Sequence, residues 1–273
     1  LNNYSHTFKK FPKKFDLVIV STTSDVRFKV FKILLKNIKF NHIIFEKILF
    51  NDLRHYSKAL KLIKKNKINS FVNCTNRMYN YVNFIKKYSK SNILNRIEMT
   101  GSNWGLCCNY IHYIDLFLYI LNKKKFDSFN PNFSNNLAKS RRINYFELFG
   151  KLNFKINKTK VLIKCNKTKS SKISYKLNFY FQNNKRIIID EINNKLLLKN
   201  KKHSKDYKIK IPYTSDVLLK FYKDIKNKKS KKEFKKLISF EDSIDLHLPV
   251  LNSFSSKFKE LKIIKNKNLC PIT

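Results

Sequence analysis

The first 90 residues alternate between short apolar runs and longer segments whose apolar residues recur at helical spacing. Three short runs rich in β-branched residues predict strands buried on both faces: DLVIVST (16–22), NHIIFEK (41–47) and SFVNCT (70–75). The segments between and after them predict helices over 25–37, 51–67 and 79–90, the second of them capped by Asn51. Strand–helix alternation with short connections is typical of a parallel sheet with crossover helices.

Parallel sheets of this kind bind ligands beyond the carboxyl ends of their strands. The residues at those ends are therefore the first candidates for a functional site. They lie at 21–24, at Glu46 and Lys47, and at 73–77.

The pattern changes after residue 102. The segment KISYKLNFYF (172–181) alternates strictly, which is typical of a half-buried antiparallel strand. The side chains expected on its buried face are Ile173, Tyr175, Leu177, Phe179 and Phe181. The other expected elements are an extended crossing segment at 94–102, helices at 108–122, 215–226 and 240–258, and an exposed lysine-rich connection at 226–236. The fold class is thus α/β, with a parallel unit over 1–96 and, over 97–273, an α+β unit with a large, mostly antiparallel sheet at 125–210.

The formal net charge of +41 invites a nucleic-acid or membrane interpretation. The enriched residues, however, are Lys, Asn, Ile, Phe and Tyr, whose codons are rich in A and T, whereas Gly, Ala, Pro and Arg are scarce. Only seven of the 59 basic residues are arginine, the better partner for phosphate and base edges. We therefore expect a diffuse surface charge that reflects coding bias, and no nucleic-acid partner.

The cysteines and the hydropathy pattern indicate a cytoplasmic protein. Five scattered cysteines, an odd number, do not make a disulfide framework. The N-terminal LNNYSHTFKKFPKKF lacks the apolar core of a signal peptide. The low-charge run 103–122 is long enough to span a bilayer, but it carries His112 and Asp115 centrally, so we expect a helix of a soluble protein and no membrane partner.

Two of the three glycines stand in GSNWGLCCNYIHYID (101–115), together with the single tryptophan. Glycine permits backbone conformations and close approaches to a ligand that other residues do not. Just downstream, Cys108, His112, Asp115 and Tyr119 follow at i, i+4, i+7 and i+11, which places them on one helical face. This stretch is therefore a candidate site.

The order of these features resembles the glucose–fructose oxidoreductase, inositol dehydrogenase and MocA family. The resemblance runs from about Asp16 to the C-terminus and is carried by STTSD (21–25), FEK (45–47), NCTNR (73–77) and NYIHYID (109–115). It implies a Rossmann domain followed by an α/β domain on an open sheet, through which copies pair as homo-oligomers. It also implies hydride transfer between NAD or NADP and a sugar, a polyol or a nucleotide sugar. The GSNWGL and CPIT stretches resemble members that act in surface-polysaccharide biosynthesis.

The resemblance implies two catalytic residues, Lys47 and His112. Lys47 stands in the family's Glu-Lys-Pro position, with Ile48 in place of proline, and its ammonium would stabilise charge on the reacting oxygen. His112 stands at the position of the catalytic histidine and would take the hydroxyl proton. Many members carry an aspartate where Cys108 stands, and Asn109 would supply hydrogen bonding to the substrate instead.

The resemblance also implies cofactor contacts at the strand ends, from Thr22, Thr23, Ser24, Asp25, Glu46, Lys47 and Arg77. Arg27 stands near a position where the family commonly has a histidine. Trp104 would contact the cofactor and form a wall of the sugar pocket. The alternative for Trp104 is a core position between the two domains.

The pyrophosphate-binding Gly-x-Gly-x-x-Gly turn of the family, and the acidic residue that binds the ribose, are absent from the 273 residues. Only fifteen residues precede the first expected strand, so we expect an N-terminally truncated member that binds the cofactor poorly. The alternatives are a non-catalytic remnant or oligomerisation module of such an enzyme, or a basic nucleic-acid-binding protein. No metal is expected, because Cys107, Cys108 and His112 lack the spaced ligand pairs of a zinc site.

Overall fold

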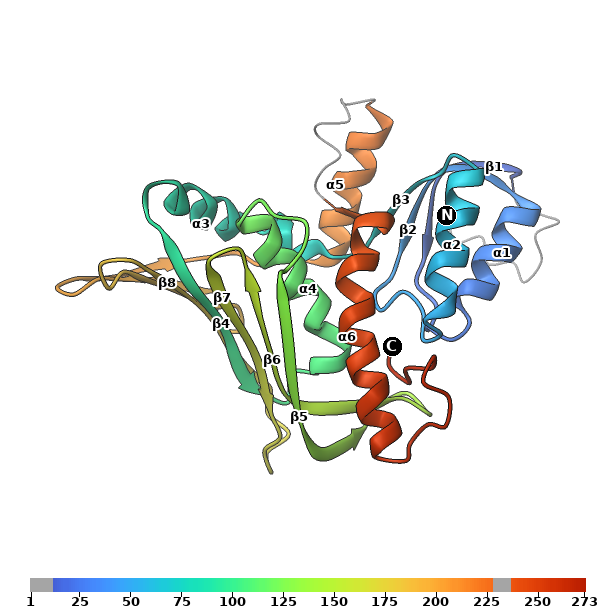
Figure 1. Ribbon diagram of the computed structural model, residues 1–273. Coiled ribbons are helices and arrows are strands. Elements are labelled where there is room, and N and C mark those ends of the chain that lie inside the picture. Colours follow the sequence, from blue (N-terminus) through green and yellow to red (C-terminus); the bar gives the residue numbers. More distant parts are fainter. Residues whose placement is uncertain (1–11, 228–236) are drawn as a thin grey trace.

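The computed structural model describes residues 12–227 and 237–273, which form two sheets with helices packed around and between them (Figure 1). Apart from its first two residues, the expected lysine-rich connection at 226–236 lies outside the described residues.

The smaller sheet has four strands in the order β1-β2-β3-β12. Three of them are parallel: β1 (Lys14–Val20), β2 (Lys39–Phe45) and β3 (Asn69–Val72). The crossover helices between them are α1 (Arg27–Asn37) and α2 (Arg54–Lys65). The predicted parallel sheet is therefore confirmed. The fourth strand, β12 (Ile238–Ser239), joins β3 in antiparallel orientation from a distant part of the chain.

The prediction that the first strand is buried on both faces is wrong. Within the described part of the chain, β1 pairs only with β2, so it lies at the edge of the sheet. Helix α5 (Thr214–Lys226) covers the face opposite α1 and α2, where Phe221 packs and Leu17 joins the same cluster. Ile19, two residues further along β1 on that face, is 47% exposed. The apolar run indicates a strand, but it does not show how far the neighbouring elements reach.

The larger sheet has eight strands in the order β11-β10-β9-β8-β4-β7-β6-β5. They are β4 (Leu94–Ser102), β5 (Ser128–Lys139), β6 (Phe146–Ile156), β7 (Thr159–Asn166), β8 (Ser174–Phe181), β9 (Arg186–Asp190), β10 (Lys195–Lys199) and β11 (Ser204–Lys208). All neighbouring pairs are antiparallel except β4 and β7, which confirms the predicted sheet. Residues 94–102 are not a crossing segment but a strand inside this sheet.

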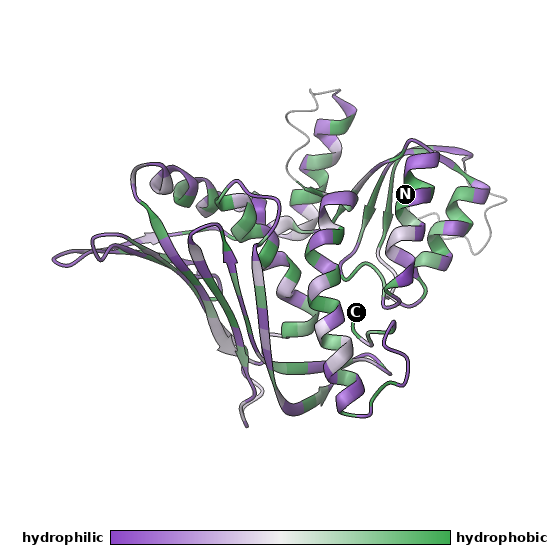
Figure 2. Ribbon diagram, viewed as in Figure 1, coloured by the Kyte–Doolittle hydropathy of each residue, from purple (hydrophilic) through white to green (hydrophobic). Residues whose placement is uncertain are grey.

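The alternation of β8 buries one of its faces, as the sequence predicts. Leu177, Phe179 and Phe181 are buried, whereas Ile173 lies before the strand and is 51% exposed. Figure 2 shows the same division, with hydrophobic residues gathered where the helices meet the sheets.

Three further helices lie on one side of the larger sheet: α3 (Asn80–Ser91), α4 (Leu106–Ile120) and α6 (Phe240–Glu260) (Figure 1). Helix α6 contacts α4 and β5 as well as α2 and β3, so it joins the two sheets. Ser239 caps α6 by accepting a hydrogen bond from the Asp242 N–H group at 3.0 Å. The predicted Asn51 cap is wrong, because α2 begins at Arg54 without a side-chain cap.

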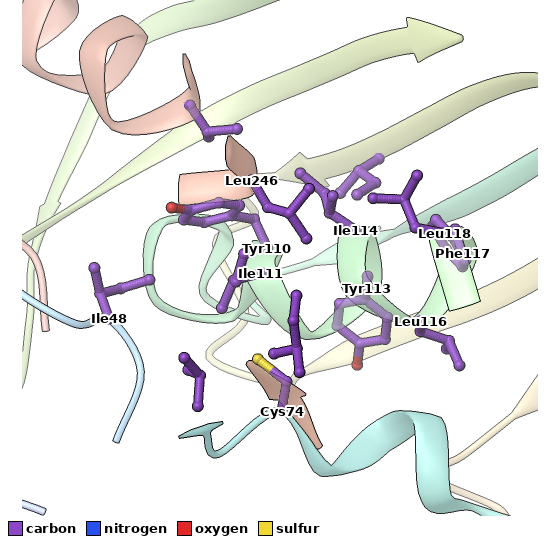
Figure 3. Packing of buried hydrophobic residues seen from close by; sticks show 14 of the residues in the cluster. Ile48, Cys74, Tyr110, Ile111, Tyr113, Ile114, Leu116, Phe117, Leu118 and Leu246 are labelled. Carbon is purple, nitrogen blue, oxygen red and sulfur yellow. The ribbon is translucent and has the colours of Figure 1, made fainter. Parts of the chain in front are cut away.

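Helix α4 lies at the centre of the molecule and is buried on most sides. Ile48 from the connection after β2, Cys74 from the end of β3 and Leu246 from α6 pack around it (Figure 3). Polar groups on this helix are therefore held in a rigid setting. In the described residues, no helix combines the length and the apolar character that crossing a membrane requires.

Candidate active site at the strand ends and helix α4

Lys47 connects the carboxyl end of β2 to the first turn of α4. Its Nζ atom donates to the Cys108 carbonyl oxygen at 2.7 Å and to Asn109 Oδ1 at 2.9 Å. The Asn109 amide in turn donates to the Trp104 carbonyl oxygen at 2.8 Å. The peptide bond after Lys47 is cis. An ammonium group has three N–H donors, so one of them is not used by these two contacts.

His112 lies one helical turn after Cys108 and is partly exposed. Its Nδ1 atom is buried and has no hydrogen-bond partner among the described residues. Burial, followed by the positive charge of Lys47 and the proximity of His247, holds the pKa of His112 well below its ordinary value. The imidazole is therefore neutral at neutral pH, which is the form that accepts a proton.

Glu46 connects the ends of β2 and β3. Its carboxylate accepts hydrogen bonds from Asn73 Nδ2 at 2.7 Å and from the Lys47 N–H group at 3.1 Å. The remaining amide oxygen of Asn73 is buried and has no partner among the described residues. An unsatisfied buried acceptor beside the strand ends suits a polar ligand that donates to it.

The end of β1 has one orphaned group of the same kind. Thr22 Oγ1 is buried without a partner in the described part of the chain, and the Thr23 hydroxyl donates to Asp25 at 2.5 Å. Ser24 is turned toward the C-terminal segment: its hydroxyl donates to the Ile272 carbonyl oxygen at 2.5 Å. Thr22 thus has the one side-chain oxygen among these three residues that is buried without a partner in the described residues.

Arg77 and Asp115 form a buried pair that does not include His112. The guanidinium donates to both carboxylate oxygens, with Nε 2.7 Å from Oδ2. The Tyr119 ring lies against the guanidinium, with Arg77 Cζ 4.8 Å from the centroid of the ring. The pair lines a cavity of about 540 Å³ whose lining contains neither Lys47 nor His112. The helical face predicted from spacing thus carries two separate polar groups.

Trp104 is buried, and its indole N–H donates to the Lys164 carbonyl oxygen at 3.1 Å. Its ring meets Tyr113 edge to face, with centroids 5.8 Å apart. Both contacts lie within residues 97–273, so they do not show the alternative position between the two domains. Gly105 has φ +77°, and a Cβ there would lie 2.9 Å from Cys108 Sγ, so this position requires glycine.

Comparison of the sequence with protein-family models and with curated proteins gives no match. Comparison of the fold with solved structures gives many matches. The transcriptional regulator Gal80p from Kluyveromyces lactis is 17% identical, covers 90% of this chain and 73% of its own, and has a TM-score of 0.67. Biliverdin reductase from Synechocystis sp., solved with biliverdin and NADP+, is 11% identical over 90% of this chain and 83% of its own, with a TM-score of 0.67.

A UDP-N-acetylglucosamine 3-dehydrogenase from Acidithiobacillus ferrooxidans is 11% identical and covers 86% of this chain and 76% of its own, with a TM-score of 0.62. The chain has the fold of these oxidoreductases. In this oxidoreductase fold Lys47 contacts Cys108 and Asn109 of α4, and its positive charge acts on His112 of the same helix. It places Arg77 and Trp104 in contacts of their own.

Two residues of the site make contacts that the sequence did not predict. Arg27 is fully buried and donates to the carbonyl oxygens of Thr22, Glu46, Ile48 and Leu49, so it ties the end of β1 to the segment that carries Lys47. Burial lowers the pKa of Arg27 to about 10. Glu147 of β6 accepts a hydrogen bond from the Cys107 N–H group at 2.9 Å, at the start of α4. A lone acidic residue in the apolar segment YFELFG is the signal that could have identified it.

The described residues contain no group of three or more His, Cys, Asp or Glu side chains arranged to hold a metal ion. All five cysteines lie in this part of the chain and are free thiols.

Proposed function

We propose that this chain is an oxidoreductase that removes hydride from a sugar or polyol hydroxyl carbon, with Lys47 and His112 as its catalytic residues. The observation that carries the proposal is the contact of Lys47 with Cys108 and Asn109, which sets an ammonium beside the unpartnered imidazole of His112. An electrophilic donor and a neutral base from different elements meet at the strand ends, where ligands of such sheets bind.

The two groups have complementary roles in this proposal. The N–H donor of Lys47 that its two protein contacts leave unused hydrogen-bonds the reacting oxygen and stabilises the negative charge that develops there. His112, neutral because its pKa is lowered, takes the hydroxyl proton through a ring nitrogen. The bonds from Lys47 to α4 hold both groups in one geometry, which reduces the entropy that the reaction must overcome.

NAD or NADP is the proposed cofactor, and it would supply the hydride acceptor. The residues present fit its nicotinamide end: the orphaned Thr22 Oγ1 and Asn73 Oδ1 atoms lie at strand ends beside Glu46. They do not fit its pyrophosphate, because the three glycines of the chain stand at 101, 105 and 150 and form no glycine-rich turn. We therefore propose weak cofactor binding by the chain as given.

The substrate class rests on the family resemblance and on similarity to the UDP-N-acetylglucosamine 3-dehydrogenase. A sugar or nucleotide sugar used in cytoplasmic carbohydrate metabolism is the proposed substrate. We also propose that copies of the chain pair through the open face of the eight-stranded sheet, and that the dispersed basic residues bind no nucleic acid.

A non-catalytic role is the second candidate. It is favoured by two observations: the similar fold of the transcriptional regulator Gal80p, and the lack of a glycine-rich turn. In that case the chain acts as a binding or oligomerisation module and Lys47 serves packing alone.

An activity screen separates the two candidates. The chain is incubated with millimolar NAD or NADP and a panel of sugars, polyols and UDP-sugars, and formation of the reduced nicotinamide is followed by absorbance. Turnover of at least one substrate, lost in the Lys47→Ala variant, is the expected result. The same background rate in the chain and in the variant, across the whole panel, would favour the binding module.

A further inference from the structure

Glu147 places a carboxylate from the larger sheet at the start of α4. It stands at the beginning of β6, forty residues after Cys107 in sequence, and its Oε2 atom accepts from the Cys107 N–H group at 2.9 Å. The helix itself begins after Gly105 and has no side-chain cap of its own. A negative charge at a helix N-terminus interacts favourably with the unpaired N–H groups there.

The same carboxylate lies close to Cys108 and interacts with the charge of Lys47. Cys108 Sγ and Glu147 Oε1 both lie close to the Cβ that a side chain at Gly105 would have, at 2.9 and 3.6 Å. Glu147 raises the pKa of the Cys108 thiol, after burial, whereas Lys47 lowers it. The two opposite charges thus contact neighbouring residues in the first turn of α4: Glu147 accepts from the Cys107 N–H group, and Lys47 donates to the Cys108 carbonyl oxygen.

The titratable groups that face Glu147 are one cation and four thiols. Lys47 is the cation, and the thiols belong to Cys107, Cys108, Cys165 and Cys270. Burial raises the pKa of each thiol, so they are neutral at neutral pH. Burial raises the pKa of Glu147, and the positive charge of Lys47, the one cation of this set, lowers it.

We propose that Glu147 is a positioning residue of this site, whose carboxylate fixes the first turn of α4 and supplies the negative charge that faces Lys47. The effect of Glu147 on turnover rests on the proposed function, whereas its electrostatic effect on Lys47 and Cys108 does not. Glu147 acts through Lys47 and α4, and it holds the Cys108 carbonyl oxygen where the ammonium can reach it.

Cys108 provides a probe that requires neither cofactor nor turnover. It is the one cysteine of the five that is not buried. Its rate of alkylation by iodoacetamide, followed across pH by peptide mass spectrometry, reports the thiolate fraction. Glu147→Gln keeps a carbonyl oxygen for the Cys107 N–H group but removes the charge. We expect about tenfold faster alkylation of Cys108 at a fixed pH near 8, because a nearby charge shifts a pKa by one to three units.

The control variant is Glu98→Gln, which removes a carboxylate that accepts from Tyr180 on the larger sheet and should leave the rate unchanged. Lys47→Gln gives a second measurement with the opposite sign, slower alkylation, and keeps the test valid if Glu147→Gln does not fold. The proposal would be overturned if the folded Glu147→Gln variant and the wild type were alkylated at equal rates. It would also be overturned if Lys47→Gln did not slow the alkylation of Cys108.

Turnover then separates this proposal from the proposed function. If both hold, Glu147→Gln lowers the turnover rate at saturating cofactor while the KM for the cofactor stays unchanged. If the alkylation rates change as expected but the wild type shows no turnover, Glu147 still positions the ammonium and the oxidoreductase proposal alone fails.

Discussion

The Nζ atom of Lys47 lies 2.7 Å from the carbonyl oxygen of Cys108. This contact joins the end of a strand in the smaller sheet to the helix that carries His112. Because the helix is buried on most sides, the ammonium and the imidazole keep a fixed relation. The predictions below test what that relation does.

Lys47→Ala and His112→Ala should each lower turnover by about 100-fold or more, since loss of an oxyanion donor or of a general base costs about that much. Their effect on cofactor affinity should be small, because neither group contacts the pyrophosphate in the proposal. Steady-state kinetics and calorimetry measure the two effects separately. Lys155→Ala on the exposed side of β6 is the matched control. Wild-type turnover in both active-site variants would mean that the stretch 101–115 serves packing.

Cofactor affinity should be weak in the chain as given. A glycine-rich turn at a helix N-terminus supplies several charge-assisted hydrogen bonds to the pyrophosphate, each worth about 1.5–3 kcal/mol. Losing two or three of them weakens binding by several orders of magnitude. Calorimetry with NADH and NADPH checks this, and we expect dissociation constants in the millimolar range. Micromolar binding would show that other groups hold the pyrophosphate.

The buried Arg77–Asp115 pair should be important for stability. The carboxylate side chain is 1% exposed and the guanidinium side chain 12%. Removing one partner leaves the other charge buried and unpaired, which costs about 3–5 kcal/mol. Asp115→Ala should lower the free energy of unfolding in urea by this amount, and Arg77→Met combined with Asp115→Leu should recover much of it. A double variant no more stable than the single one would contradict this account.

The spacing of apolar residues predicted the strands and helices on which the site is built, because the periodicity of these elements can be recognised in the sequence. This spacing misjudged β4, because its pairing with β8 is irregular. The register shifts between Leu94 and Arg96, so the apolar residues of this strand do not alternate over its whole length. The apolar pattern of β4 therefore does not indicate that this segment pairs in parallel with β7 and antiparallel with β8.

The candidate site shows the same limit. The motif positions of Lys47 and His112 could be read from the sequence, but their partners could not. Glu147 contacts the N–H group of Cys107, forty residues earlier in the chain, and Arg27 donates to four carbonyl groups on two segments. Such contacts follow from how the sheets and helices pack, which no local spacing encodes.

Stability should fall as the pH drops from about 6.5 to 4, and His247 should account for part of the loss. This side chain is fully buried in α6, its Nδ1 atom is 2.8 Å from the Ser243 carbonyl oxygen, and burial lowers its pKa to about 4. An unfolded histidine titrates near pH 6.5, so between these values the unfolded chain binds the extra proton and is favoured. The stabilisation is complete above pH 6.5, and about 2 kcal/mol of it is lost at pH 5.

The lowered pKa of His112 adds a loss of the same sign. His247→Gln should therefore reduce the difference in unfolding free energy between pH 7 and pH 5, as measured by urea denaturation at the two pH values. His203→Gln is the matched control, because His203 is exposed and its replacement should leave the full pH dependence. A His247→Gln variant that loses as much stability as the wild type between the two pH values would show that His247 is protonated in the folded protein as well.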